Sequence, residues 1–128
     1  MSDIASRTVH AYNEHIKQHP LPAPGRGLLA LAFDMPNHGT RLVSDEANHA
    51  WDKGNENHAI DMLGMVKGGR ADMSALIDVV GGYLRREVDG HLVLGWSLGG
   101  HSAWEAWAGE ERIDAAAAVV GCPDFMGE

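Results

Sequence analysis

The residues with the clearest chemical potential are the five at positions 95–99, which read Gly-Trp-Ser-Leu-Gly. They lie between an apolar run, His91–Trp96, that predicts a buried strand, and a stretch rich in small residues, Leu98–Ala108, that predicts a helix. A serine at such a junction is lifted off the end of the strand and can attack a carbonyl carbon. We therefore predict that Ser97 is a nucleophile, held in a strained backbone conformation at the start of the helix.

Two glycines and one backbone amide complete the predicted site. Because the turn is tight, side chains two positions before and two positions after the serine would clash, so glycine is expected to be required at Gly95 and Gly99. The N–H of Leu98 would donate to the oxyanion, at a helix end where the dipole also favours negative charge. A simpler interpretation stays open, in which these residues form an ordinary glycine-rich turn and Ser97 only caps the helix.

The elements that must position this serine alternate between helices and strands. A helix beginning near Ser2 is predicted by one apolar stripe, and the prolines at 20, 22 and 24 end it. The run Gly27–Phe33 is apolar throughout, which is typical of a strand buried on both faces of a parallel sheet. Residues 35–39 then read as a tight loop.

The rest of the chain continues this alternation. A helical stripe over Ala59–Val66 is broken by Gly68-Gly69, and Asp72 is expected to cap a second helix that reaches Leu84. The segment Asp114–Cys122 is rich in alanine, but its last residues favour a strand over a helix. The order predicts a single α/β domain over residues 1–128, a three-layer sandwich with a parallel sheet.

The sequence resembles the α/β-hydrolase superfamily over nearly its whole length. Besides the serine motif, residues 29–41 (LALAFDMPNHGTR) look like the fourth strand and its Asp-x-x-x-His-Gly loop, and residues 119–125 (VVGCPDF) look like the end of the sixth strand. A group of uncharacterised fungal hydrolases in the superfamily is also similar. The resemblance implies a partial α/β-hydrolase fold, about strands four, five and six. It further implies a serine hydrolase that cleaves an ester, amide or thioester of a small-molecule acyl substrate.

The resemblance also implies which residues accompany Ser97. In the superfamily the acid and the histidine follow the serine along the chain, so this sequence is expected to be a central part of a larger domain, weak or inactive by itself. Asp124 is the candidate acid, because a minority of the superfamily take their acid after the sixth strand. His38 is the candidate base on a ground other than the resemblance: loops that follow parallel strands gather at the same edge of the sheet as the serine. Since the superfamily places another strand between the fourth and the fifth, we expect an unstable chain or direct pairing of 27–33 with 91–96.

The composition argues against several other classes of protein. The 128 residues contain 10 Lys and Arg against 18 Asp and Glu, a formal net charge of −8 without a basic cluster, which argues against nucleic-acid binding. No apolar stretch approaches the ~20 residues that cross a bilayer, and no signal peptide is visible. The single cysteine, Cys122, cannot form an internal disulfide, so a reducing, cytoplasmic location is predicted. Cys122 itself is expected to be a small buried residue at a strand end. No metal site and no cofactor are predicted.

Two alternative functions stay open. The residues from Gly95 to Ser102 differ by one residue from the phosphate-binding pattern Gly-x-x-x-x-Gly-Lys-Ser, because His101 stands where the lysine would be. A degenerate nucleotide-binding module is therefore one alternative to the hydrolase, and a non-catalytic fragment or pseudo-enzyme is the other. Neither the substrate nor the oligomeric state follows from the sequence.

Overall fold

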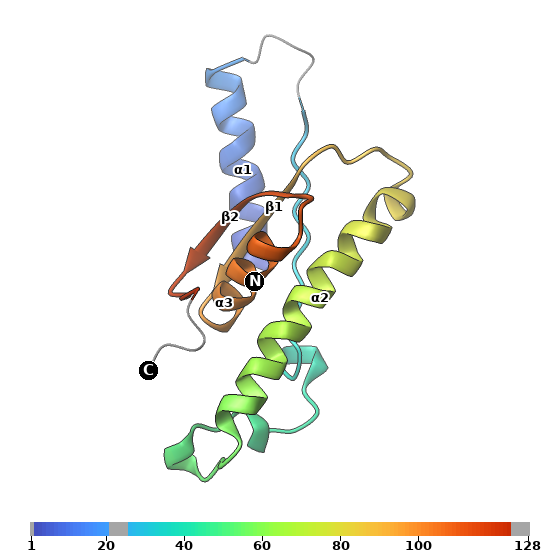
Figure 1. Cartoon of the computed structure of the whole chain (residues 1–128). Helices are drawn as coiled ribbons and strands as arrows, with labels where there is room; N and C mark the ends of the chain where they lie inside the picture. Colours follow the sequence, from blue (N-terminus) through green and yellow to red (C-terminus); the bar gives the residue numbers. More distant parts are fainter. Residues whose placement is uncertain (1, 21–25, 124–128) are drawn as a thin grey trace. The chain divides into compact units, whose positions relative to one another are not determined.

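The first part of the chain contains one helix and one extended segment. The computed structural model describes residues 2–20 and 26–123, and the chain divides into two compact units, Met1–Asp34 and Met35–Glu128. In the first unit the predicted helix is confirmed as α1 (Ser2–Gln18), and an extended segment follows from Arg26 (Figure 1). The Tyr12 hydroxyl donates to the carbonyl oxygen of Arg26 at 2.8 Å, which ties the segment to the helix. A single domain over residues 1–128 stays a prediction.

The predicted strand over Gly27–Phe33 is wrong. Residues 26–35 belong to no strand, and Leu29 and Leu31 are 61% and 52% exposed, where burial on both faces was expected. An apolar run becomes a strand only where a neighbouring backbone supplies ladder hydrogen bonds. Within the described part of the chain no segment does so for this run, and its predicted direct pairing with 91–96 is wrong for the same reason.

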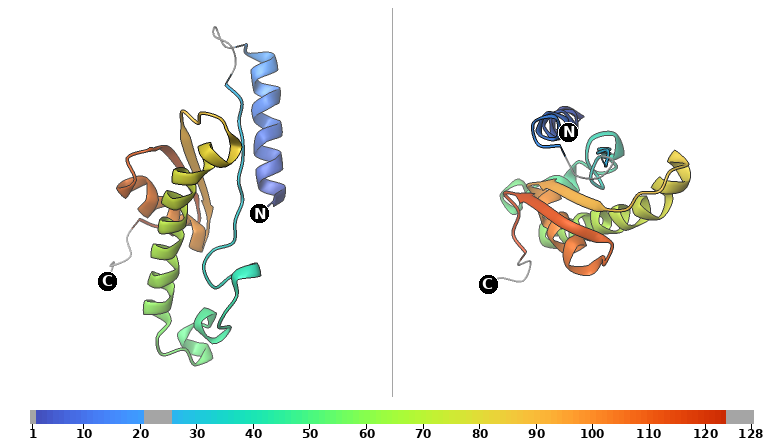
Figure 2. Two further views of the ribbon diagram at one scale, coloured as in Figure 1. Left: turned by 90° about the vertical axis from the view of Figure 1, so that its right-hand side faces the viewer. Right: turned by 90° about the horizontal axis from the view of Figure 1, so that it is seen from above.

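The second unit is built on a two-stranded parallel sheet, so the chain has the mixed α/β class that the sequence predicts. The strands are β1 (His91–Trp96) and β2 (Ile113–Val119), in a register that places Trp96 opposite Val119. Helix α3 (Leu98–Gly109) connects them, as a parallel pair requires, and packs against the sheet (Figures 1 and 2). The predicted strands at 91–96 and in the alanine-rich segment are therefore confirmed.

The two faces of β1 are in different surroundings. On the face that α3 covers, Val93 is half-buried and Gly95 is buried. On the opposite face Leu92, Leu94 and Trp96 are 68%, 42% and 54% exposed, and we call these three residues the apolar stripe. The sheet thus has one helical layer packed on it within this unit, and the layer expected on its other face is not formed there.

The region between residues 58 and 84 is one helix instead of the predicted two. Helix α2 (His58–Leu84) runs through Gly68-Gly69 without a break. Gly69 is buried, and a Cβ built on it would lie 2.7 Å from Ser102 Oγ of α3. Close packing of α2 on α3 at this point outweighs the cost of glycine in a helix, about 1 kcal/mol per residue. Asp72, the expected cap, instead forms an ion pair with Arg41 at 2.5 Å.

The core of the second unit lies where α2, α3 and the sheet meet. Its buried apolar side chains are Met65 and Val66 of α2, Ala103 and Ala106 of α3, and Ile113 of β2. Buried Ser102 donates its hydroxyl to the carbonyl oxygen of Val66 at 3.0 Å, which satisfies it in this apolar setting.

A loop with three short 3-10 helices leads into α2. They are η1 (Gly39–Arg41), η2 (Glu46–Asn48) and η3 (Trp51–Lys53). Asn37, at a φ of 59°, holds this loop, because its side-chain oxygen accepts from the backbone N–H groups of Val43 and Ser44 at 2.9 and 2.8 Å. Asparagine tolerates this left-handed conformation better than most residues.

Not every glycine of α2 has a packing role, and Gly64 offers a stability test. A Cβ built on Gly64 would meet no atom within 4 Å. Replacing Gly64 by alanine is expected to raise the free energy of unfolding by about 0.5–1 kcal/mol, because alanine loses less backbone entropy on entering a helix. Urea unfolding measures the change. Gly69→Ala is the matched comparison and is expected to destabilise, because its methyl group would press on Met35 and Ser102.

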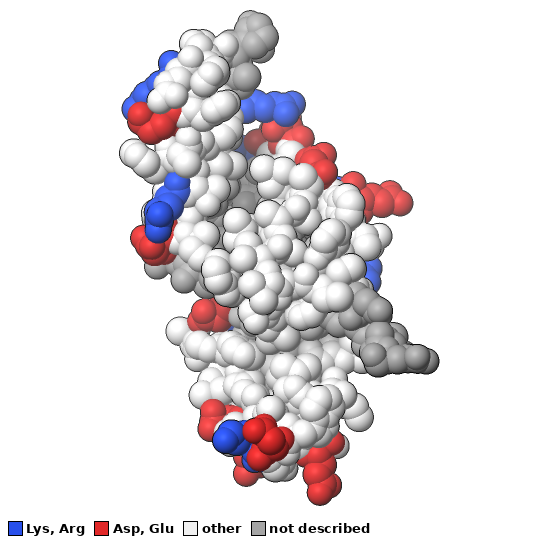
Figure 3. Space-filling model, turned by 90° about the vertical axis from the view of Figure 1, so that its left-hand side faces the viewer, with Lys and Arg blue, Asp and Glu red and all other residues white. Residues whose placement is uncertain are grey.

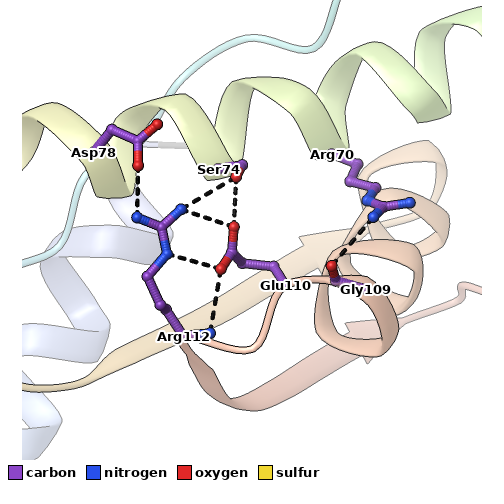
Figure 4. A network of polar contacts seen from close by, with 6 residues as sticks. All are labelled: Arg70, Ser74, Asp78, Gly109, Glu110 and Arg112. Atoms are coloured by element: carbon purple, nitrogen blue, oxygen red, sulfur yellow. Dashed lines mark hydrogen bonds and ion pairs between the residues drawn. The ribbon is translucent and has the colours of Figure 1, made fainter.

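A polar network joins the end of α3 to α2 (Figure 4). Arg112 donates from Nε to Glu110 at 2.8 Å and from its terminal nitrogen to Asp78 at 2.5 Å. Ser74 also donates its hydroxyl to Glu110. The hydrogen bond from Arg112, and then the one from Ser74, holds the pKa of Glu110 far below its usual range.

Because of this network, the free energy of unfolding is expected to decrease as the pH becomes acidic. Because the pKa of Glu110 is lower in the folded chain than the value of about 4.3 expected when unfolded, its contribution is present above that pH. The contribution is lost as the pH falls toward the folded pKa. We expect Glu110→Gln to destabilise the protein at pH 7 and to have a smaller effect at pH 3, in urea unfolding at both pH values. An equal effect at both would contradict the assignment.

Candidate active site

Ser97 stands alone between strand and helix. It follows the last residue of β1 and precedes the first residue of α3, with φ 51° and ψ −116° and an exposed side chain. A non-glycine residue at this φ and ψ is in a sparsely populated region of backbone space, at a cost of roughly 1–3 kcal/mol. The strained conformation predicted from the sequence is thus confirmed, and the hydroxyl stands at the carboxyl end of the strand.

The two glycines of the motif differ in the space around them. A Cβ built on Gly95 would overlap the carbonyl group of Gly99, so glycine is required there, as predicted. A Cβ built on Gly99 would have only the sulfur of Met35 within 4.0 Å, which is ordinary contact. The prediction that packing requires glycine at Gly99 is therefore wrong, because a Cβ at this position would meet no atom of β1 within 4 Å.

Two backbone donors are available beside the serine. The N–H groups of Leu98 and Gly99 open α3, and neither has a hydrogen-bond acceptor among the residues that the structure describes. The first N–H groups of any helix lack partners within it, and they attract negative charge together with the helix dipole. The Leu98 N–H therefore has the availability that an oxyanion donor needs.

Two glycines whose role the sequence did not predict pack against each other behind the motif. A Cβ built on Gly100 would lie 3.0 Å from the Cα of Gly121, and Gly100 is buried. Gly121 follows β2, so this contact joins the first turn of α3 to the chain leaving the neighbouring strand. The only signal in the sequence was a glycine near the end of each predicted element.

The predicted partners of Ser97 are not joined to it. The Ser97 hydroxyl makes no hydrogen bond with any residue in the ranges 2–20 and 26–123, His38 included. His38 is half-buried in the loop after residue 35, with Nδ1 3.0 Å from the carbonyl oxygen of Pro36. A carbonyl oxygen only accepts, so Nδ1 carries the proton in that hydrogen bond and the lone pair of the neutral ring is on Nε2. Asp124 lies outside the described residues.

His101 lies one helical turn after the serine and faces the chain beyond β2. Its Nδ1 is 2.9 Å from the carbonyl oxygen and 3.2 Å from the backbone nitrogen of Cys122. Cys122 is exposed, so its predicted burial is wrong. The strand ends at Val119, three residues earlier than expected, and this leaves the cysteine on the surface.

The geometry does not suit the nucleotide-binding alternative. A phosphate-binding loop of the Gly-x-x-x-x-Gly-Lys-Ser type wraps several backbone N–H groups around the phosphates. Here a single residue, Ser97, separates the strand from the helix, and His101 in the lysine position contacts Cys122.

Other kinds of site find little support in the described ranges. Within them, no three His, Cys, Asp or Glu side chains are grouped so that they could hold a metal ion. None of the helices described there combines the length and the apolar character needed to cross a bilayer. On the face drawn in Figure 3, basic side chains are interspersed with acidic ones and form no continuous basic area.

Comparison of the chain with known protein families, curated proteins and solved structures finds no match.

Proposed function

We propose that this chain provides the nucleophile of a serine hydrolase of the α/β-hydrolase type, which cleaves an ester, amide or thioester. One observation carries the proposal: Ser97 is exposed and has φ 51° and ψ −116° at the junction of strand and helix. A serine that only capped α3 would have its side chain bonded to the helix, and Ser97 makes no such cap hydrogen bond. A serine whose backbone is strained and whose hydroxyl does not cap the helix is typical of a hydroxyl that is presented for reaction.

The chemistry follows from the groups around this hydroxyl. Ser97 Oγ would attack the acyl carbon while its proton passes to a base, and the tetrahedral intermediate would place its negative oxygen at the N–H of Leu98. We propose His38 as the base and Asp124 as the acid. His38 is suited to the role because Pro36 fixes the proton on Nδ1, which leaves Nε2 to accept one. To do so, the loop that carries His38 would have to bring Nε2 to Ser97.

The finer fold is part of the same proposal. In an α/β-hydrolase sheet β1 and β2 would be the fifth and sixth strands. One observation supports a larger sheet: the apolar stripe of β1 has no layer of its own unit over it.

The non-catalytic alternative is supported by one specific observation. The Ser97 hydroxyl has no hydrogen-bonded base within the described ranges, so as placed it has the weak nucleophilicity of an ordinary serine. A pseudo-enzyme would keep the turn and its strain but would not react.

A fluorophosphonate probe distinguishes the two. Ser97 Oγ would attack phosphorus and displace fluoride, so the protein would gain the mass of the probe less HF. We expect one probe per chain, mapped to Ser97 by peptide mass spectrometry, and no labelling after unfolding in urea. Labelling that persists in urea, or that maps elsewhere, would contradict the proposal. Absence of labelling in the folded protein would favour the pseudo-enzyme. Thermal stabilisation by ATP with Mg²⁺ would revive the nucleotide-binding alternative.

A further inference from the structure

The last residue of β2 and the residues that follow it contact the turn around Ser97. We call Val119–Cys122 the β2 exit segment. The backbone N–H of Ser97 donates to the carbonyl oxygen of Val119 at 2.8 Å, so the serine is bonded to the neighbouring strand. Two residues later the chain meets α3 again, because a Cβ built on Gly121 would lie 2.7 Å from the Cα of Gly100. The exit segment therefore contacts the start of α3 at two points, at Ser97 just before the helix and at Gly100 within its first turn.

Two further features belong to the same segment. Val120 has a φ of 60°, which is rare for a β-branched residue, while its side chain is 77% exposed. Because the Val120 side chain packs little, side-chain packing does not explain its positive φ. The positive φ is explained by the backbone, which turns at this residue from β2 toward α3. The next contact lies on that path, where the ring of His101 meets the backbone of Cys122 at 2.9 and 3.2 Å.

We infer that the β2 exit segment is a clamp that keeps Ser97 in its strained conformation, and that Gly121 is a positioning residue for the Ser97 hydroxyl. A residue persists at φ 51° and ψ −116° only where its surroundings leave it no alternative. The N–H of Ser97 is fixed by Val119, and its carbonyl oxygen accepts from Gly100 at 2.8 Å. Gly100 in turn rests on Gly121, so both ends of the serine are tied to the same segment.

Gly121 is the point at which this clamp can be loosened selectively. Its φ is not in the left-handed region, so alanine fits its backbone conformation. The added methyl group would instead meet the backbone of Gly100, which cannot rotate away as a side chain would. The exit segment would have to move off α3, lengthen the hydrogen bond from Ser97 to Val119 and let the serine relax.

The consequence for reactivity rests on the proposed function, and the test separates the two ideas. We expect Gly121→Ala to lower the rate of Ser97 labelling by the fluorophosphonate probe about 10–100-fold, since small misplacements of reacting groups have effects of this size. The shape of the pH–rate profile should be unchanged, because no titrating group is removed. Gly64→Ala is the matched glycine control and should leave the rate unchanged, since that position is open.

Stability must be separated from positioning. In the double variant Gly64→Ala/Gly121→Ala the first substitution offsets part of the destabilisation by the second. A rate that stays as low as in Gly121→Ala although the stability has risen supports the clamp, and a rate that rises with the stability overturns it. The ring contact offers a second variant that adds no atoms, His101→Ala, for the case that Gly121→Ala does not fold. It should lower the rate, and a wild-type rate would overturn the clamp.

A measurement independent of activity completes the test. NMR chemical shifts and backbone coupling constants of Ser97 report its φ directly. They should change in Gly121→Ala and remain as in the wild type in Gly64→Ala. An unchanged Ser97 in a folded Gly121→Ala variant overturns the inference. If the wild type is not labelled but its Ser97 signals show positive φ that Gly121→Ala removes, the hydrolase proposal fails and the clamp stands.

Discussion

Replacing Ser97 by glycine is expected to abolish reaction with a fluorophosphonate probe and at the same time to stabilise the fold. Labelling is lost because the substitution removes Ser97 Oγ, the attacking oxygen in the proposal. The stabilisation arises because glycine adopts φ 51° without strain. Relief of roughly 1–3 kcal/mol, less about 0.5–1 for the greater freedom of glycine in the unfolded chain, leaves a net gain of about 1 kcal/mol.

Ser97→Ala is the matched variant, because alanine also lacks the hydroxyl but keeps a Cβ. It should be unreactive and remain close to the wild type in its free energy of unfolding. Ser44→Ala, an exposed serine in the loop before α2, is the control for labelling and should react at the wild-type rate. Urea unfolding and intact-mass labelling give both quantities. If glycine at 97 were less stable than alanine, the assigned backbone conformation would be wrong.

The second large effect is expected within the same motif, where Gly95→Ala and Gly99→Ala should have opposite consequences. The methyl group of Ala at 95 would overlap the carbonyl of Gly99, which is backbone and cannot be moved without displacing α3. We expect a loss of about 3 kcal/mol or more, at the upper end of overpacking effects. Ala at 99 should be neutral or stabilising by about 0.5 kcal/mol, because it lies in a helix with open space beside it.

Thermal and urea unfolding of the two single variants would decide this. Equal destabilisation by both substitutions would contradict this difference. It would support the prediction from the motif alone, in which both glycines are required. A tolerated Gly95→Ala would contradict the close approach of β1 and α3 that the whole site depends on.

The local structure around Ser97 could be predicted because its causes are local. An apolar run, a glycine two residues before the serine and a following run of small residues are enough to specify the strand, the turn and α3. A side chain at position 95 would clash with the backbone of Gly99, which is only four residues later in the chain. For this reason the strain at Ser97 followed from the sequence alone.

The features that the sequence did not predict depend on residues distant along the chain. Helix α2 continues through Gly68-Gly69 because Gly69 packs against Ser102, 33 positions later in the sequence. The run Gly27–Phe33 has the composition of a strand but lacks a pairing neighbour among the described residues. Composition reports what a segment can bury, whereas pairing depends on what is placed beside it.

The partners of the serine were the least predictable part of the site. A histidine acts on a hydroxyl only at hydrogen-bond distance, and no pattern in the sequence encodes that distance. The loop position of His38 was correct, but its ring lies against Pro36. The contact of Gly100 with Gly121 could not be predicted because it is between backbone atoms, which every residue has, so no residue type in the sequence indicates it.

The apolar stripe formed by Leu92, Leu94 and Trp96 has a consequence for how the purified protein behaves in bulk. Attraction between such surfaces strengthens on warming, while a formal net charge of −8 keeps molecules apart and is screened by added electrolyte. Colloidal stability should therefore be greatest in cold, dilute buffer, and turbidity should rise first when warmth and high ionic strength are combined.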